Sequence, residues 1–327
     1  MLNSTEQLAT QSSFFPQVSV IIPIYNGEED LSDLINCLRS QTYPNSKIEY
    51  LLVNNNSNDN TSKILGENVI EMTEIGINLK VLNENKIQSS YAARNQGIRH
   101  ATGEILAFTD ADCRPIPNWI EELVKPFMDE KVGIVVGELT ALPGESLWEK
   151  YAERYEVMSQ KFLLEHPFLP YGQTANLGIR YKIFQEVGLF RPYLTTGGDA
   201  DICWRIQQKT NWKIGVSPQA IIRHRHRSSL KEFQSQFRRY GCSNRYLHDL
   251  YDVNLMPEFT IKEASYRLGS WLFKDIPKNM IKLIMGKATP LDLIKTPIDL
   301  IRFQARSQGQ KEAQLPENAK EIEWLSN

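Results

Sequence analysis

Two aspartates that lie two positions apart, Asp110 and Asp112, are the residues whose type and spacing point most directly to chemistry. They follow a short apolar run, Ile105 to Phe108, that is typical of a buried strand. If the backbone stays extended, both carboxylates leave the strand end on the same side. Such close carboxylates repel each other, and Mg²⁺ or Mn²⁺ bound to the phosphates of a nucleotide would remove that conflict. A solvated turn is the alternative interpretation of the pair.

The elements that must position this pair follow an alternating pattern. Strands are predicted at 18–24, 48–53, 79–82 and 105–108, with helices between them, for example at 29–40 and 90–100. This alternation predicts an α/β protein with a parallel sheet covered on both faces, whose ligands lie beyond the carboxyl ends of the strands. Later strands are expected at 132–139, 174–180, 212–216 and 220–222, and later helices at 146–164 and 229–250. After Met256 we expect short helical pieces broken at Pro277, Pro290 and Pro297.

Length and composition describe an ordinary globular chain. Its 327 residues are 41% hydrophobic and 23% charged, which allows one large domain or a domain with an appendage. A net charge of −2 and a short basic segment without interleaved aromatic residues give no support for nucleic-acid binding. The four cysteines form no C-x-x-C pair, which favours a reducing compartment. Without a run of 18 apolar residues or a signal peptide, we expect a cytoplasmic protein, in solution or peripheral on the cytoplasmic face of a membrane.

Several stretches resemble, in order and spacing, those of the inverting family 2 glycosyltransferases with the GT-A fold. They are VSVIIPIYNGEE (18–29), LLVNNNSNDNT (51–61), AARNQGIRHATGEILAFTDAD (92–112), NLGIRYKIFQEVGLF (176–190) and GGDADICWRI (197–206). The resemblance covers about residues 18–245 and implies a Rossmann-like, mixed and mostly parallel sheet flanked by helices. The expected parts are a flexible leader (1–17), a glycosyltransferase domain (18–255) and a helical C-terminal extension with a polar tail (256–327). Within the domain, the nucleotide-binding part would span about 18–115 and the acceptor part about 116–255.

The resemblance implies a nucleotide site in the first half of the chain. Its members would line the nucleobase, the ribose and the phosphates: Pro23, Tyr25, Arg94 and Asp110. Asn54 stands where most relatives have an aspartate that accepts a hydrogen bond from uracil. Because an amide oxygen can still accept, a UDP-sugar donor is favoured, while GDP- and dTDP-sugars stay open.

The resemblance also implies a metal site and a general base. Asp112 would ligate the divalent cation, with His224 near the metal and diphosphate and His226 as its rival. Neighbouring basic residues could neutralise phosphate charge: Arg223, Arg225 and Arg227. Family members usually carry Glu-Asp-x-Asp where this chain has Gly198-Asp199-Ala200-Asp201, so Asp199 inherits the role of the base. Asp201 is expected to bond to neighbouring backbone or to Arg205.

The function expected from this resemblance is metal-dependent, inverting transfer of a sugar from a nucleotide sugar to a hydroxyl of a glycan or lipid-linked acceptor, in polysaccharide or cell-envelope glycan synthesis. One alternative is a non-catalytic nucleotide-sugar-binding relative, which Asn54 and Gly198 would favour. Another is a sugar-nucleotide nucleotidyltransferase. That class would need a glycine-rich, basic loop after the first strand, whereas residues 25–29 of this chain are acidic.

The C-terminal region allows two interpretations. Between Tyr266 and Phe303, large apolar residues mix with lysines: Lys274, Lys278, Lys282 and Lys287. This pattern resembles an amphipathic segment at a membrane surface, which would suit a lipid-linked acceptor. Alternatively, the apolar face packs on the catalytic domain.

Overall fold

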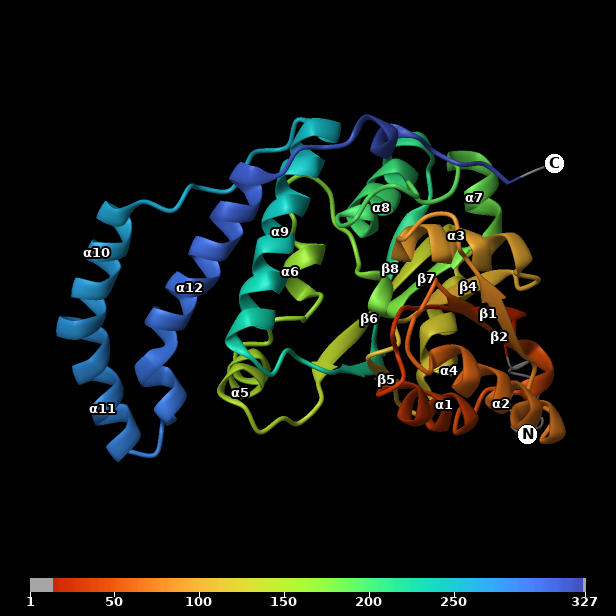
Figure 1. Ribbon diagram of the computed structural model, residues 1–327, viewed down its shortest axis with the longest axis horizontal. Helices are drawn as coiled ribbons and strands as arrows, with labels where there is room; N and C mark the ends of the chain where they lie inside the picture. The colour runs from red at the N-terminus through yellow and green to blue at the C-terminus, as the bar shows by residue number, and fades with distance from the viewer. Residues whose placement is uncertain (1–13, 326–327) are drawn as a thin grey trace, which may run out of the picture.

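The computed structural model describes residues 14–325 and is built around an eight-stranded sheet in the order β3-β2-β1-β4-β7-β6-β8-β5 (Figure 1). The first four strands are parallel: β1 (Val18–Ile24), β2 (Ile48–Asn54), β3 (Leu79–Asn83) and β4 (Ile105–Phe108). The second half is mixed and comprises β5 (Cys113–Pro115), β6 (Val132–Ala141), β7 (Leu177–Arg180) and β8 (Lys213–His224). There β7 is antiparallel to β4 and β6, and β5 is antiparallel to β8. The predicted mixed α/β sheet is confirmed.

The strands form because their residues are apolar on both faces. Every residue of β1, β2 and β4 is buried, as a sheet covered on both sides requires. One face packs against α1 (Leu31–Arg39), α2 (Thr61–Glu74) and α4 (Trp119–Val124). The other packs against α3 (Ser90–His100), α7 (Tyr181–Val187) and α8 (Gly198–Lys209), on the opposite side of the sheet in Figure 1. Short 3₁₀ turns lie at Asn45–Lys47, Lys125–Met128, Thr174–Asn176 and Glu317–Lys320.

The structure differs from the predicted elements in three places in the second half of the chain. The proline-containing segment after Asp112 forms β5, an edge strand of the sheet, where a proline is tolerated. The helix expected at 146–164 is broken into α5 (Leu147–Arg154) and α6 (Lys161–Leu164). The chain leaves the helical path at Glu156, which adopts a φ of +46°, and Gln160 Nε2 then donates to the carbonyl oxygens of Gly137 and Asn176. The strands expected at 212–216 and 220–222 are one strand, β8.

The C-terminal helices are longer than the prolines suggested. They are α9 (Leu230–Tyr251), α10 (Ile261–Ser270), a π-helical turn (Trp271–Asp275), α11 (Ile276–Ile284) and α12 (Pro290–Glu312). Pro290 lies in the first turn of α12, where a missing N–H has no cost. Pro277 lies inside a continuous helix, directly after the π-helical turn, which accommodates the backbone hydrogen bond that a proline cannot make. Pro297 lies inside α12, so the breaks predicted at Pro277 and Pro297 are wrong.

The helix α12 packs closely on α9 through two glycines. A Cβ at Gly241 would lie 1.9 Å from the carbonyl oxygen of Arg306, and a Cβ at Gly309 would lie 1.9 Å from that of Arg238. Buried apolar residues of both helices complete the contact: Phe233, Phe237, Ile298 and Ala305.

Both ends of the described chain return to the domain. The Phe15 ring lies 5.2 Å from the Tyr43 ring, whose hydroxyl donates to Pro16, while residues 1–13 of the expected leader lie outside the described residues. Near the other end, Glu323 accepts hydrogen bonds from Arg99 and Asn95. Between residues 14 and 325, no helix combines the length and apolar character needed to cross a membrane.

We predict that Gly241→Ala destabilises the protein by about 1–3 kcal/mol, because the added methyl forces α9 and α12 apart. Gly269→Ala, in α10, is the matched control, since a Cβ there meets nothing within 4 Å and should stabilise by about 0.5–1 kcal/mol. Urea unfolding of both variants tests this prediction. Equal effects of the two substitutions would contradict the close crossing of α9 and α12.

Candidate active site

A cavity of about 650 Å³ opens beyond the carboxyl ends of β1 and β4. Its walls come from the residues after β1, the start of α3, the Asp110–Asp112 turn, the start of α8, the end of β8 and the middle of α9. It brings together most of the residues singled out from the sequence: Pro23, Tyr25, Arg94, Asp110, Asp112, Asp199, His224 and Arg225. Asn54, Asp201, Arg223 and His226 do not line it.

The wall formed by the first half of the chain offers a flat ring beside a fixed ion pair. Tyr25 is 54% exposed, so its ring is free to receive a planar ligand. Arg94 is buried, and its Nη2 lies 2.5 Å from Asp110 Oδ1. This charge-assisted hydrogen bond fixes the orientation of Asp110 at the cavity edge.

The asparagine that lines the cavity is Asn55, not Asn54. The Asn54 amide donates to Ser62 Oγ at 2.9 Å and accepts from the backbone of Ser57, so it holds the loop before α2. Asn55 lines the cavity, and its side chain donates to the carbonyl oxygens of Glu84 and Ile87. Successive side chains at a strand end point to opposite sides, so a shift of one residue changes the role. The expected contact of Asn54 with the base therefore loses its support.

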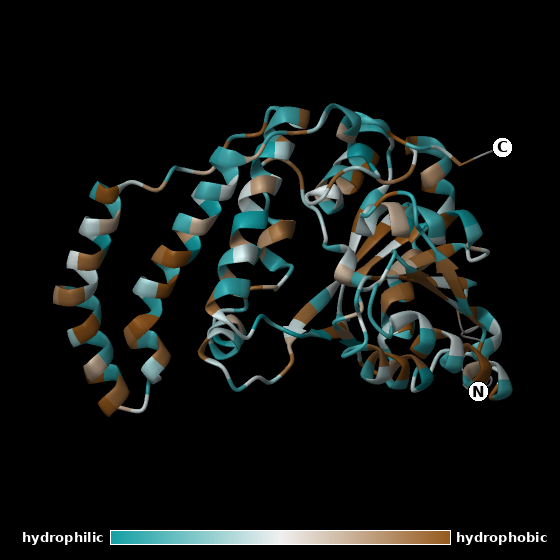
Figure 2. Cartoon of the chain, in the orientation of Figure 1, coloured by the Kyte–Doolittle hydropathy of each residue, from teal (hydrophilic) through white to brown (hydrophobic). Residues whose placement is uncertain are grey.

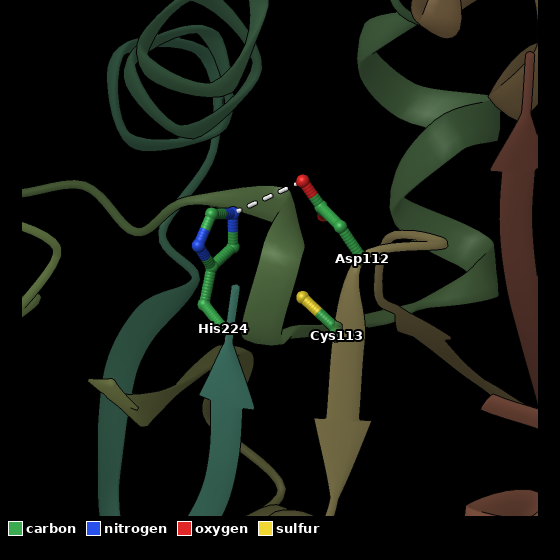
Figure 3. Close-up of side chains that lie close together, drawn as sticks. All are labelled: Asp112, Cys113 and His224. Carbon is green, nitrogen blue, oxygen red and sulfur yellow. Dashed lines mark ion pairs between the residues drawn. The ribbon is translucent and has the colours of Figure 1, made fainter. Parts of the chain in front are cut away.

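Asp112 and His224 face each other across two paired strands (Figure 3). The register of β5 and β8 places Cys113 opposite His224, and Asp112 Oδ2 lies 3.5 Å from His224 Nε2. Asp112 also lies 3.4 Å from Arg227. Burial alone would raise the pKa of Asp112, but the neighbouring His224, Arg227 and Arg225 hold that pKa below its ordinary value.

The donor atoms of Asp112, Cys113 and His224 lie within 4.8 Å of one another and could hold a cation. Burial, and then the charges of Asp112 and Asp110, raise the pKa of the Cys113 thiol well above its ordinary value. A thiol that stays protonated is not a metal ligand. The ionised Asp112 and the imidazole of His224, whose Nδ1 has no partner among the described residues, offer oxygen and nitrogen instead. Such a pair fits Mn²⁺ or Mg²⁺ better than a thiolate-seeking metal.

The histidines and arginines of residues 223–227 lie in different surroundings. The rings of His224 and His226 lie 5.6 Å apart on one side of the chain, whereas Arg223 is exposed. His226 lines a separate pocket of about 220 Å³, and burial together with His224 and Arg227 lowers its pKa to about 4. His226 is therefore neutral at neutral pH. Of the two rivals, His224 is the one that faces both the cavity and Asp112.

Asp199 lies in the first turn of α8 and is held by one neutral partner. The Thr174 hydroxyl donates to Asp199 Oδ1 at 2.6 Å, and no described cation lies within ion-pair distance of the carboxylate. Burial raises the pKa of Asp199, and Arg94 and the Thr174 hydrogen bond offset this shift only in part. A carboxyl group of this kind is well suited to accept a proton.

The neighbours of Asp199 have structural roles. A Cβ at Gly198 would lie 2.6–2.9 Å from ring atoms of Tyr91, so the Tyr91 ring occupies the space that a glutamate at this position would need. Asp201 is buried and forms ion pairs with Arg191 and Arg205, and the expected bond to Arg205 is confirmed.

Part of the cavity wall was not predicted from the sequence. Three residues of α9 line the cavity, at the helical spacing i, i+3 and i+4: Gln236, Arg239 and Tyr240. That spacing was the available signal, but it also fits an ordinary helix face. The other cavity arginines are paired: Arg94 with Asp110, Arg225 with Asp30 and Arg227 with Asp112. Arg239 forms no ion pair within the described part of the chain.

The sheet order and the cavity at its carboxyl edge define a protein of the GT-A glycosyltransferase fold. Residues 19–214 match the family described as Glycosyl transferase family 2, and the chain belongs to that family. Glycosyltransferase AglE of Haloferax volcanii is 38% identical over 190 residues, which are 58% of this chain and 60% of that relative. The chain thus spans three fifths of the length of this curated relative.

Two solved structures show the same fold. The mannosyltransferase PcManGT from Pyrobaculum calidifontis, in complex with GDP-Man and Mn²⁺, superposes with a TM-score of 0.62 at 18% identity over 92% of this chain and 88% of that one. GalNAc-T7 with UDP, GalNAc and Mn²⁺ gives a TM-score of 0.53 at 18% identity, over 81% of this chain and 57% of that one.

Asp199→Asn should stabilise the folded protein at neutral pH. Because the folded-state pKa of Asp199 is raised, its contribution to stability is complete below the ordinary pKa and is lost as pH rises through the folded-state pKa. Asparagine does not ionise, so the variant's advantage in free energy of unfolding over the native chain should vanish near pH ~4, close to the ordinary pKa of aspartate. Urea unfolding of the native chain and the variant at neutral pH and near pH ~4, with a chelator present, measures this difference in stability.

Asp112→Asn is the control of opposite sign, because the pKa of Asp112 is lowered and its ionised form stabilises the fold. Lower stability of Asp199→Asn at neutral pH would contradict the burial of an ionisable carboxyl group at this position.

Proposed function

We propose that this chain is a metal-dependent, inverting glycosyltransferase that moves a sugar from a nucleotide-sugar donor to a hydroxyl of a glycan or lipid-linked acceptor. The observation that carries the proposal is that Asp199 and the Asp112–His224 pair, which come from distant segments, line one cavity. Its free cysteines suit a reducing compartment such as the cytoplasm.

The first half of the chain would hold the nucleotide. The exposed ring of Tyr25 offers a stacking surface for the base, worth about 1–3 kcal/mol. Arg94 holds Asp110 in place beside the ribose, and Asn55 takes the position at the cavity wall that the sequence assigned to Asn54. Because Asn55 also carries an amide oxygen that can accept a hydrogen bond, a UDP-sugar stays the favoured donor, and GDP- and dTDP-sugars stay open. The two solved structures contain GDP-Man in one case and UDP in the other, so both nucleotides remain candidates.

The end of β8 would hold the diphosphate. Asp112 and His224 would bind a divalent cation, which supplies positive charge to the diphosphate as its bond to the sugar breaks. Arg225 and Arg227 line the same wall and could donate charge-assisted hydrogen bonds to phosphate oxygens. Mn²⁺ in the PcManGT and GalNAc-T7 structures supports a cation in this fold.

Asp199 would act on the acceptor. Its carboxylate takes the proton from an acceptor hydroxyl while that oxygen attacks the anomeric carbon on the face opposite the leaving diphosphate, which inverts the configuration. Thr174 keeps one carboxylate oxygen engaged, so the other is free for the hydroxyl. We assign Gln236, Arg239 and Tyr240 to contacts with the acceptor or the phosphates, because α9 closes the remaining wall.

Asp199→Asn should leave donor binding nearly intact and lower turnover at least about a hundredfold, since an amide cannot take the proton. Donor binding is measured by thermal shift with Mn²⁺ and a panel of UDP-, GDP- and dTDP-sugars. A donor at about 100 times its dissociation constant should add about 2.7 kcal/mol to the apparent free energy of unfolding. Asp249→Asn is the matched control, because this aspartate pairs with Arg245 outside the cavity.

Three outcomes would overturn the proposal. Normal turnover of Asp199→Asn would show that Asp199 is not the general base. Donor binding without any Mn²⁺-dependent transfer or hydrolysis by the native chain would identify a non-catalytic binding protein. Release of pyrophosphate from a nucleoside triphosphate and a sugar phosphate would identify a nucleotidyltransferase.

A further inference from the structure

Exposed large apolar side chains gather on one helix at the end of the molecule far from β1–β3. We call residues 261–284, which comprise α10, the π-helical turn and α11, the outer helix. In Figure 1 it lies beyond α12 and α9, and Figure 2 shows brown, hydrophobic residues recurring along it. The exposed members include Ile261, Tyr266, Leu268, Leu272, Phe273, Met280, Ile281 and Ile284. Such a concentration marks an interaction surface.

One face of the outer helix is anchored to α12 and the other is free. The Trp271 indole donates to the carbonyl oxygen of Leu293 at 2.7 Å, and Asn279 donates to that of Asp292 at 2.8 Å. Four apolar residues at helical spacing form the apolar stripe on the free face: Phe273, Met280, Ile281 and Ile284. Phe273 is 78% exposed and Ile284 is 83% exposed, so no other described part of the chain covers the stripe. Of the two sequence interpretations, packing on the domain holds for α12 but not for the outer helix.

The charge around the apolar stripe has one sign. Residues 261–287 contain six basic and two acidic residues. The whole chain has a formal net charge of −2, which leaves −6 on the remaining residues. Four lysines flank the stripe and are exposed: Lys274, Lys278, Lys282 and Lys287. A basic apolar surface on an otherwise acidic protein is complementary to an anionic surface that also has an apolar interior.

We propose that the outer helix docks on an anionic lipid surface. The apolar stripe enters the boundary between headgroups and acyl chains, and the flanking lysines contact lipid phosphates. A second copy of this chain fits less well, because a symmetric dimer would place the same lysines against one another. Docking goes beyond the proposed transfer reaction and requires no donor, metal or turnover.

The support of the outer helix also connects it to the cavity. The same helix, α9, lines the cavity with Gln236, Arg239 and Tyr240 and packs on α12 at Gly241. A docked outer helix would therefore hold the cavity at a fixed position relative to the lipid surface.

Vesicle flotation of the full chain tests docking. We expect it to float with vesicles of phosphatidylcholine and phosphatidylglycerol, and much less with phosphatidylcholine alone or at high salt, where charge attraction is screened. Phe273→Ser/Ile284→Ser should weaken binding about tenfold or more, because the apolar anchors are lost. Lys274→Gln/Lys278→Gln/Lys282→Gln should weaken binding to the anionic vesicles by about tenfold or more.

Ile70→Ser is the matched control, since Ile70 on α2 is 63% exposed but lies outside the outer helix, and it should float like the native chain. All substituted residues are exposed, and circular dichroism checks that each variant is folded. Failure of the native chain to float with anionic vesicles would overturn docking, as would flotation of Phe273→Ser/Ile284→Ser at native levels. A dimer in sedimentation equilibrium that Phe273→Ser/Ile284→Ser dissociates, without lipid binding, would assign the surface to a second copy instead.

Discussion

The compensation of buried negative charge is the constraint on which the rest of the structure depends. The cavity gathers four carboxylates from three distant segments, and all but one have a cationic partner. Asp110 pairs with Arg94, Asp30 with Arg114 and Arg225, and Asp112 with His224 and Arg227. Asp199 has only the Thr174 hydroxyl. This difference separates carboxylates that ion pairs hold in place from Asp199, whose pKa is raised by burial. We infer from it that Asp199 is the carboxylate that takes a proton.

The pairing of the strands brings these charged side chains together. Parallel strands bring the Tyr25 turn and the Asp110–Asp112 turn to one edge. Asp112 would still lack a histidine without β5, since only the antiparallel pairing of β5 and β8 places His224 beside it. On the other side of the cavity, Gly197 adopts a φ of +82° and Gly198 makes room for Tyr91, which brings the start of α8 close to α3. The Tyr91 ring beside Gly198 explains why this position departs from the family pattern, which has a glutamate there.

Much of this could be predicted from the sequence, for physical reasons that can be named. Buried strands such as β1 and β4 are continuous apolar runs, and polar residues directly after them must lie at the sheet edge, so Asp110 and Asp112 were found without coordinates. The position of Asp199 followed from the resemblance of residues 197–206 to the family pattern. The choice between Asn54 and Asn55 depended on one residue of register at a strand end, which periodicity does not resolve.

Other features depend on contacts between distant segments. The edge strand β5 contains a proline, a residue that argues against strands until the position in the sheet is known. The place of Arg239 in the cavity wall became visible only when α9 was placed against the cavity. Similarly, the apolar and basic pattern after residue 260 fitted packing and exposure equally well, and the structure assigns packing to α12 and exposure to the outer helix.

The pH dependence of kcat/KM in the native chain and in Thr174→Val tests the central claim most directly. If Asp199 is the base, activity falls on the acid side around a pKa above the ordinary value for aspartate, ~3.9. Loss of the Thr174 hydrogen bond, which favours the ionised carboxylate, then moves this acid limb to higher pH. An acid limb that stays at the same pH in Thr174→Val would contradict the account, because the group that must lose its proton would then not be Asp199.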